Sequence, residues 1–292
     1  MILDNIVQAL KYIAECYKMV VEEPKLLLPS LASVIVGSFI GIFVIGFTIA
    51  FDIIGRFSLY LFGFFVLTAL FISYLTSYMF MGISSFAVYE HVKYGRSSLG
   101  KAVNVTMSRA GTVMLLAAVA VVIGLLAKNL KNKSHSRGGI VIGMIGSLVG
   151  EVLEEGWSIA SRLLVPIAVI SGLGFTDTFR KAFDIVTRNL VLIGAGEVGL
   201  RILTGAFGFV CTFLTIAAAV GLFIVLSPLN IIAAIAAAVF FAFTAISVVS
   251  TLNLFVKTSY YTLVYAWAED RIEHGSTYTI QAPAPLRNAF GM

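Results

Sequence analysis

The stretch WSIASRLLVPIAVISGLGFTDTFRKAFDIVTRN, from Trp157 to Asn189, decides the fold class. It is apolar from Leu163 to Leu173, and a basic amphipathic helix pattern follows from Thr176 to Asn189. Two glycines between them, Gly172 and Gly174, favour a sharp turn. An apolar segment followed by a basic amphipathic one is typical of a helix that crosses a membrane and then continues along its surface.

The composition of the whole chain agrees with this interpretation. Of the 292 residues, 59% are hydrophobic and only 12% are charged, and the mean hydropathy is +0.99. Soluble domains average about 45–50% apolar and about 25% charged residues. The composition therefore excludes an ordinary soluble domain, and the long continuous apolar runs predict helices rather than the short alternating strands of a membrane β-barrel.

We predict an all-α, polytopic membrane bundle of about six spans, formed as a single domain over residues 1–292. An amphipathic helix fills residues 1–25, the bundle residues 26–268, and a polar tail residues 269–292. The expected spans are residues 26–51, 57–80 and 109–128, the apolar segment after Arg162, and two crossings within residues 202–256 that meet at Ser227-Pro228-Leu229-Asn230. The Ala-rich last span is suited to the bundle interior, and Lys257, Tyr260, Tyr261, Tyr265 and Trp267 predict an aromatic belt at its end.

One segment conflicts with the simplest topology. Basic loops favour the cytoplasmic face, which places both termini and most basic segments on the cytoplasmic side of the plasma membrane. With six spans, however, the basic loop from Lys128 to Arg137 would lie outside. A re-entrant pair, Ile140 to Val149 and Ser158 to Leu173, would remove the conflict but change the number of full crossings. We keep six spans and cytoplasmic termini as the prediction.

Two short basic segments are similar to each other. Leu99 to Val105 aligns with Phe179 to Ile185, and each follows one apolar span and precedes another. Either the chain contains an internal repeat of span, in-plane helix and span, or two cytoplasmic linkers share their composition by chance. As in-plane helices, the two segments would present lipid-facing basic residues: Lys101, Arg109, Arg180, Lys181 and Arg188.

Five ionisable residues in apolar surroundings are candidates for a transport site or polar network: Glu151, Glu155, Arg162, Glu197 and Arg201. Charges at membrane depth are costly and mark functional sites by default. Glu197 and Arg201 are four residues apart and can pair on one helix face. The other three share a stripe if one helix runs through them. Structural salt bridges are one interpretation, and a proton or cation relay is the other.

The sequence contains no catalytic motif, cofactor-binding loop or metal-ligand spacing. We therefore expect a protein that is not an enzyme, with no cofactor, no metal and no nucleic-acid partner. The partners we expect are membrane lipid, a second copy of the chain in a homo-oligomer, and a small solute or cation.

Two family resemblances follow from particular residues. The residues Pro166 to Gly172, Phe179, Lys181-Ala182-Phe183, Arg188-Asn189 and Glu269-Asp270 resemble the C-terminal half of the choline transporter-like family. The whole chain resembles prokaryotic six-span membrane families of unknown function, through Pro24-Lys25-Leu26-Leu27-Leu28-Pro29 and Val165-Pro166. The first resemblance implies a transporter or channel-like protein for a small cation or organic solute, without carrying over choline specificity. The second implies architecture alone and leaves open a non-transporting membrane scaffold or lipid-interacting oligomer.

Overall fold

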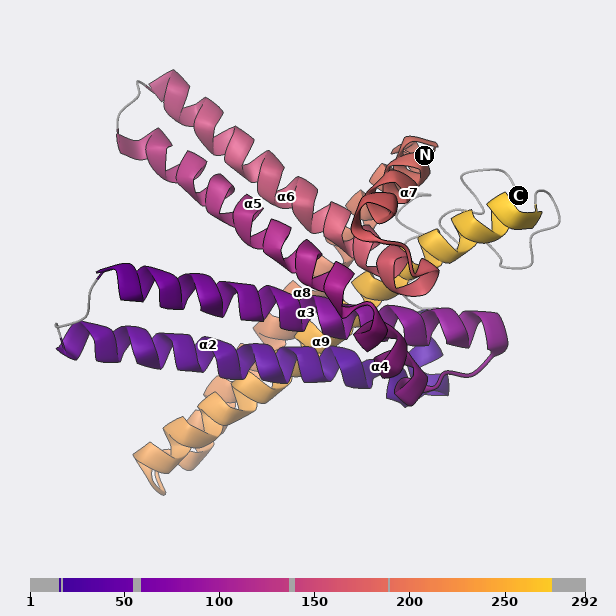
Figure 1. Cartoon of the computed structure of the whole chain (residues 1–292). Helices are drawn as coiled ribbons and strands as arrows, with labels where there is room; N and C mark the ends of the chain where they lie inside the picture. Colours follow the sequence, from indigo (N-terminus) through magenta and orange to yellow (C-terminus); the bar gives the residue numbers. More distant parts are fainter. Residues whose placement is uncertain (1–15, 17, 55–58, 137–139, 189, 275–292) are drawn as a thin grey trace. The chain divides into compact units, whose positions relative to one another are not determined.

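The computed structural model describes residues 16, 18–54, 59–136, 140–188 and 190–274 (Figure 1). Within these ranges the chain is almost entirely helical and has no strand. Most of the predicted N-terminal amphipathic helix and most of the polar tail fall outside them; residues 18–22 of the former are helical. The elements are the 3₁₀ helix η1 (Pro24–Leu27) and the α-helices α2 (Leu28–Ile54), α3 (Leu59–Tyr94), α4 (Leu99–Ser108), α5 (Ala110–Ser136), α6 (Ile140–Ser171), α7 (Phe175–Arg188), α8 (Leu190–Leu226) and α9 (Ile231–His274).

Five of the described helical segments are long and apolar enough to cross a membrane: Pro24–Ile49, Leu61–Tyr94, Ala110–Leu130, Gly199–Leu226 and Ile231–Asp270. A sixth crossing results if Ile159–Ser171 and Phe175–Thr187, which meet at an angle of 118°, are taken as one broken span. The structure thus confirms an all-α protein with five to six candidate membrane spans, at the expected places in the sequence.

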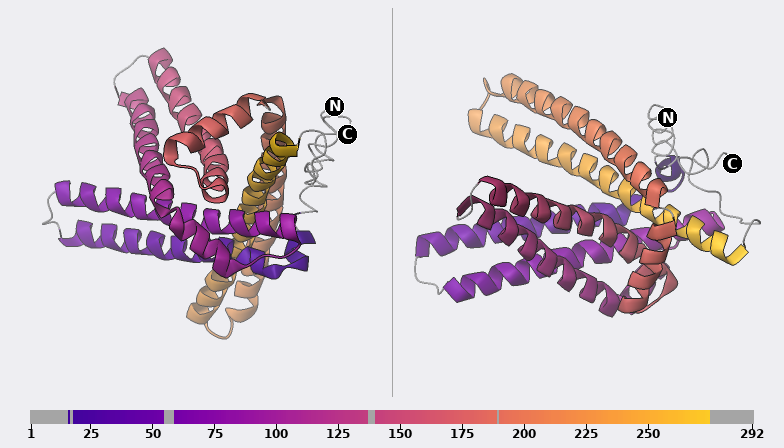
Figure 2. Two further views of the ribbon diagram at one scale, coloured as in Figure 1. Left: turned by 45° about the vertical axis from the view of Figure 1, so that its right-hand side comes forward. Right: turned by 90° about the horizontal axis from the view of Figure 1, so that it is seen from above.

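The chain forms two compact units, one of residues 1–35 and 186–292 and one of residues 36–185. In the second unit α5 and α6 form a long hairpin, side by side in Figures 1 and 2, and α3 packs on α4, α5 and α6. In the first unit α8 and α9 form a hairpin, seen in the right-hand view of Figure 2, and η1 contacts α9.

A glycine marks the point where α3, α4 and α6 meet. A Cβ atom on Gly82 of α3 would lie 2.9 Å from Cγ2 of Thr106 in α4 and 2.9 Å from Cγ2 of Val169 in α6. Both neighbours are buried and β-branched, so their side chains have little freedom to move away. Glycine is therefore what allows these three helices to approach closely.

Two further glycines turn the chain from a long helix into a short one. Gly95, after α3, has a φ of +73°, and Gly172, after α6, has a φ of +70°. This left-handed conformation is cheap for glycine and ends many helices. The Gly95 N–H donates to the carbonyl of His91 at 2.8 Å, which closes the last turn of α3. The predicted turn at Gly172 is confirmed, and the two short segments predicted to be similar both follow such a turn.

The hairpin of α5 and α6 corrects one prediction and one alternative. Residues 128–136 continue α5 rather than forming the predicted loop. The alternative of a re-entrant pair does not describe residues 140–171, which form a single helix that includes Pro166. The end of an apolar run is not the end of a helix, because Lys, Leu and Glu are good helix formers and the two helices pack along each other.

The last helix, α9, corrects three more predictions. At 44 residues, α9 is about 66 Å long, roughly twice the thickness of a bilayer's hydrocarbon core. Its Ala-rich half is largely exposed rather than interior, whereas Tyr260, Tyr261, Tyr265 and Trp267 are buried rather than forming an exposed belt. The helix also continues to His274, into the segment predicted as a tail.

Candidate functional site

The candidate site centres on Glu197, a buried carboxylate of α8 that is only 5% exposed. Its Oε1 accepts a hydrogen bond from Nε of Arg201 at 3.2 Å, one turn along the same helix. Its Oε2 accepts a hydrogen bond from the hydroxyl of Tyr261 in α9 at 2.5 Å. The predicted Glu197–Arg201 pair is therefore confirmed, and the carboxylate also joins two helices.

The α8–α9 turn sets the register that brings these residues together. Asn230 begins α9 as a cap, because its Oδ1 accepts the N–H groups of Ile232 at 2.9 Å and Ala233 at 3.0 Å. The predicted turn at Ser227–Asn230 is thus confirmed. Farther along the hairpin, a Cβ atom on Gly208 would lie 3.2 Å from Nδ2 of Asn253, so the two helices stay close.

Sequence reasoning missed Tyr261 as the partner of Glu197, although a signal for it exists. Glu197 lies 30 residues before Ser227, and Tyr261 lies 31 residues after Asn230. Two antiparallel helices that leave one tight turn have the same rise per residue, so residues at equal distances from the turn lie at the same level. Counting outward from the predicted turn would have placed the two residues side by side.

The segment of α9 around Tyr261 is aromatic and rich in hydroxyl groups. The ring of Tyr260 meets that of Tyr261 edge to face, with centroids 5.3 Å apart. Thr258, Ser259 and Thr262 of α9 are buried close to Tyr261 in the sequence, and the Ser259 hydroxyl has no hydrogen-bond partner among the described residues. A carboxylate that accepts from a tyrosine beside a second aromatic ring is a chemical setting suited to a cation.

The side chain of Arg201 balances the charge of Glu197 and is 42% exposed. A cation that binds to the carboxylate therefore has to compete with the guanidinium, which can move outward because it is exposed. Arg201 can thus act as an internal counter-ion that a small cation replaces.

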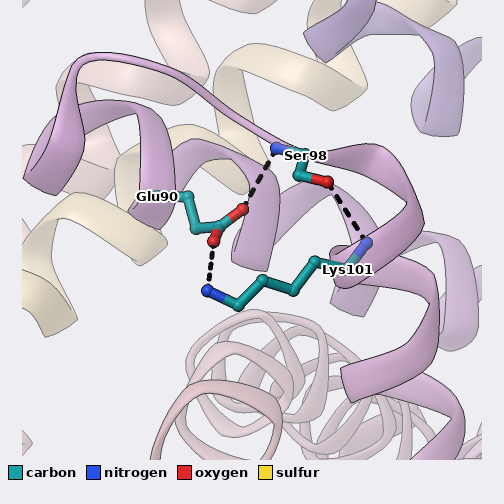
Figure 3. A network of polar contacts seen from close by, with 3 residues as sticks. All are labelled: Glu90, Ser98 and Lys101. Carbon is teal, nitrogen blue, oxygen red and sulfur yellow. Dashed lines mark hydrogen bonds and ion pairs between the residues drawn. The ribbon is translucent and has the colours of Figure 1, made fainter.

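A second buried carboxylate, Glu90 at the end of α3, fixes the turn into α4 (Figure 3). Its Oε1 lies 2.6 Å from Nζ of Lys101, and its Oε2 accepts the N–H of Ser98 at 3.1 Å. The Ser98 hydroxyl in turn accepts the N–H of Lys101 at 3.5 Å, which makes Ser98 the N-cap of α4. The hydrogen bond to Glu90, and then its negative charge, raise the pKa of Lys101.

The stretch that decides the fold class is held in place by aromatic contacts within the second unit. Nε1 of Trp157 in α6 donates to the hydroxyl of Tyr78 in α3 at 3.0 Å. The Trp157 ring is stacked near that of Phe179 in α7, with centroids 6.2 Å apart, and Phe179 is 4.9 Å from Phe175. These contacts join α3, α6 and α7 around the bend.

The remaining predicted network residues lie in α6. One helix does run through Glu151, Glu155 and Arg162, as the predicted stripe requires, but the side chains of the two glutamates are outside the described part. Arg162 is half-buried in the second unit, whereas Glu197 and Arg201 belong to the first. A relay through all of them stays a prediction.

The basic residues predicted to face lipid have different surroundings. Arg180 is exposed and lies 3.8 Å from Asp177 one turn away, and Lys181 is half-buried. Arg109 is exposed, yet its Cζ lies only 2.8 Å from where a Cβ on Gly172 would be. Lys101 pairs with Glu90, and the side chain of Arg188 is not described. Their contact with lipid stays a prediction.

The described residues contain no group of three or more His, Cys, Asp or Glu side chains that could hold a metal ion. Two glutamates in the described ranges are buried, Glu90 and Glu197. Of these two, Glu197 connects two long helices, through a residue 64 positions away.

Comparison with known proteins identifies the family. A search of curated proteins finds none that matches. A family model described as "Family of unknown function (DUF6159)" matches residues 59–275, which run from α3 to the end of α9 and include both glutamate sites. The match gives no support to the choline transporter-like resemblance and agrees with the resemblance to a family of unknown function. The chain therefore belongs to the DUF6159 family.

Proposed function

We propose that the protein is a membrane transporter or channel-like protein for a small cation, and that Glu197 is the residue that binds the cation. The observation that carries the proposal is the buried Glu197 carboxylate, held by Arg201 and by Tyr261 at the end of two long apolar helices. Keeping an ionised group buried is costly, and proteins keep such groups in membrane helices mainly for ion and substrate pathways.

The geometry supports a cation rather than an anion. The carboxylate accepts from a phenol and a guanidinium, both of which leave its negative charge in place. Binding would replace one partner by another cation of equal charge and would leave the buried site neutral. An anion would meet the carboxylate itself, so it would be repelled unless Arg201 moved toward it.

The experiment is a flux measurement on purified protein in liposomes, with outward gradients of H⁺, Na⁺, K⁺ or choline followed by a potential-sensitive dye. We expect flux of at least one cation above that of empty liposomes, and its loss in Glu197→Gln. The control is Glu90→Gln, which neutralises an equally buried glutamate that holds a turn. Equal flux in the two variants, or no flux from the wild-type protein, would reject the proposal.

The alternative function is a non-transporting membrane scaffold or lipid-interacting oligomer. It is favoured by the many large apolar side chains that are exposed on the spans, among them Phe39, Phe43, Phe64, Phe209, Phe213 and Phe240. Absence of flux for every cation, together with a stable dimer or larger assembly by light scattering in detergent, would establish this alternative.

We also propose the plasma membrane as the location, with both termini on the cytoplasmic side. The support is the distribution of Lys and Arg along the chain. Reporter fusions at the two ends, one active only in the cytoplasm and one only outside, test the proposal. A signal from the outside reporter would overturn it.

A further inference from the structure

We propose that α4 and α7 form a continuous platform in the headgroup layer of one membrane leaflet, where it binds anionic phospholipid. This inference does not depend on whether the protein transports a cation. It rests on the connections of the two helices, the contact of Arg109 at the end of α4 with the turn before α7, their exposed side chains and their charge.

The connections of α4 fix its depth. It lies between the candidate spans Leu61–Tyr94 and Ala110–Leu130, and only residues 95–98 and Arg109 separate it from them. A helix of 10 residues with such short connections stays at the ends of the two spans, which is the membrane surface. The chain also bends by 118° between Ile159–Ser171 and α7, so α7 turns away from the direction of α6.

Contacts at the ends of the helices make α4 and α7 neighbours. Arg109, the residue that ends α4, places its guanidinium against Gly172, in the turn between α6 and α7. One turn earlier, Thr106 of α4 meets Val169 of α6 at Gly82. The C-terminal end of α4 therefore adjoins the N-terminal end of α7, at the same end of α6.

Both helices bury mostly small side chains, with Ile185 as the exception, and expose large apolar ones. Ala102 and Thr106 of α4, and Thr178, Ala182 and Ile185 of α7, are buried. In contrast, Met107 is 58% exposed and Phe183 is 71% exposed, and Val103 is exposed beside Met107 on the α4 helix. A large apolar side chain on the outer side of a helix at membrane depth is the feature by which interfacial helices contact acyl chains.

The charge of the two helices indicates the class of lipid. Residues 99–109 and 175–188 carry five basic residues and two acidic ones. Arg180 is 79% exposed and Arg109 is also exposed, so their guanidinium groups can meet phosphate oxygens. The ion pair of Arg180 with Asp177 is long and exposed, hence weak. An excess of cations beside exposed apolar groups fits anionic headgroups.

The first experiment maps contact with lipid. Single cysteines replace Phe183, Met107, Asn104 or Thr176 in a background where Cys16 and Cys211 are serine, and each carries an environment-sensitive fluorophore in lipid nanodiscs. Asn104 and Thr176 are the controls, because they are exposed polar residues of the same helices. We expect lipids with a quencher near the headgroup to quench the labels at residues 107 and 183 roughly twofold more than the controls.

The second experiment tests the lipid class, with nanodiscs that contain spin-labelled phosphatidylglycerol or phosphatidylcholine. We expect the wild-type protein to enrich phosphatidylglycerol, and Arg109→Gln and Arg180→Gln to reduce the enrichment by up to about fivefold each. Water-like labels at residues 107 and 183 would overturn the platform. Quenched labels without preference for phosphatidylglycerol would overturn the assignment of anionic lipid.

Discussion

The two buried glutamates differ in what their partners connect. Glu90 and Glu197 are both almost fully buried, and each faces a cation that is about half exposed, Lys101 at 56% and Arg201 at 42%. Glu90 binds the backbone and side chain of a turn within 11 residues of itself. Glu197 reaches the hydroxyl of Tyr261, 64 residues away on another long helix.

This difference separates a local contact from a contact between two long helices. A carboxylate that fixes the chain just beyond its own helix has partners that any such turn requires. A carboxylate that joins α8 to α9 has a partner that no turn requires, and it is the residue to which we assign cation binding in the proposed function. Burial and charge alone do not tell the two sites apart, and the position of the partners does.

The largest effect is expected when Glu197 becomes leucine. The substitution removes the acceptor of the buried Tyr261 hydroxyl and the partner of Arg201, so we expect a loss of about 2–3 kcal/mol in unfolding free energy. Unfolding by SDS in mixed micelles measures it. Asp177→Asn, in an exposed pair, is the control and should change stability by less than about 0.5 kcal/mol. A loss no larger than that of the control would contradict the prediction.

Next in size is Glu90→Ala, which removes the acceptor of the Ser98 N–H. We expect a loss of about 1–2 kcal/mol, with faster hydrogen exchange confined to the turn and the start of α4. Cation flux should be unchanged, because this site is local. If the substitution abolished flux while the protein stayed folded, the distinction between the two glutamates would be wrong.

A smaller effect is expected from Tyr261→Phe, because Glu197 keeps its pair with Arg201. We expect a loss of about 1 kcal/mol in the same SDS titration. The double variant with Glu197→Leu should lose less unfolding free energy than the sum of the two single variants, because both substitutions remove the same hydrogen bond. Additive losses would show that the two side chains do not interact.

The smallest effect concerns the alkaline stability of the Glu90 site. The pKa of Lys101 is raised in the folded protein because of Glu90. The contribution of the Lys101–Glu90 pair to folding stability is therefore fully present below the unfolded pKa of about 10.4 and is lost as the pH rises through the folded pKa. We expect the difference in Tm between wild type and Lys101→Met to be constant from about pH 7 to 9 and to shrink above about pH 10.4. A difference that grows with alkaline pH would refute the pair.

The sequence predicted the local features of the fold. The positions of the spans follow from apolar runs, and the Gly172 turn and the turn before Ile231 follow from residue chemistry. The pairing of Glu197 with Arg201 follows from their helical spacing. Each of these depends on residues that are close in the chain.

The remaining features depend on packing, which hydropathy does not report. In a membrane protein the side chains that face lipid are as apolar as those in the core. Residue type and hydropathy therefore predict an exposed belt at Tyr261 and Trp267 and an interior helix for the Ala-rich half of α9, and the structure shows the opposite burial for both. The Glu90 site was missed because its partners meet only after Gly95 reverses the chain.

The unbroken course of α9 from Ile231 to His274 has a mechanical consequence. A helix without a hinge behaves as a stiff rod, so its exposed half and the half that carries Tyr261 tilt together. Helices adjust their tilt to the thickness of the surrounding bilayer. A tilt of about 10° moves a point about 30 Å along the rod sideways by roughly 5 Å. In a bilayer, a change in membrane thickness that tilts the α8–α9 hairpin would therefore displace its polar end.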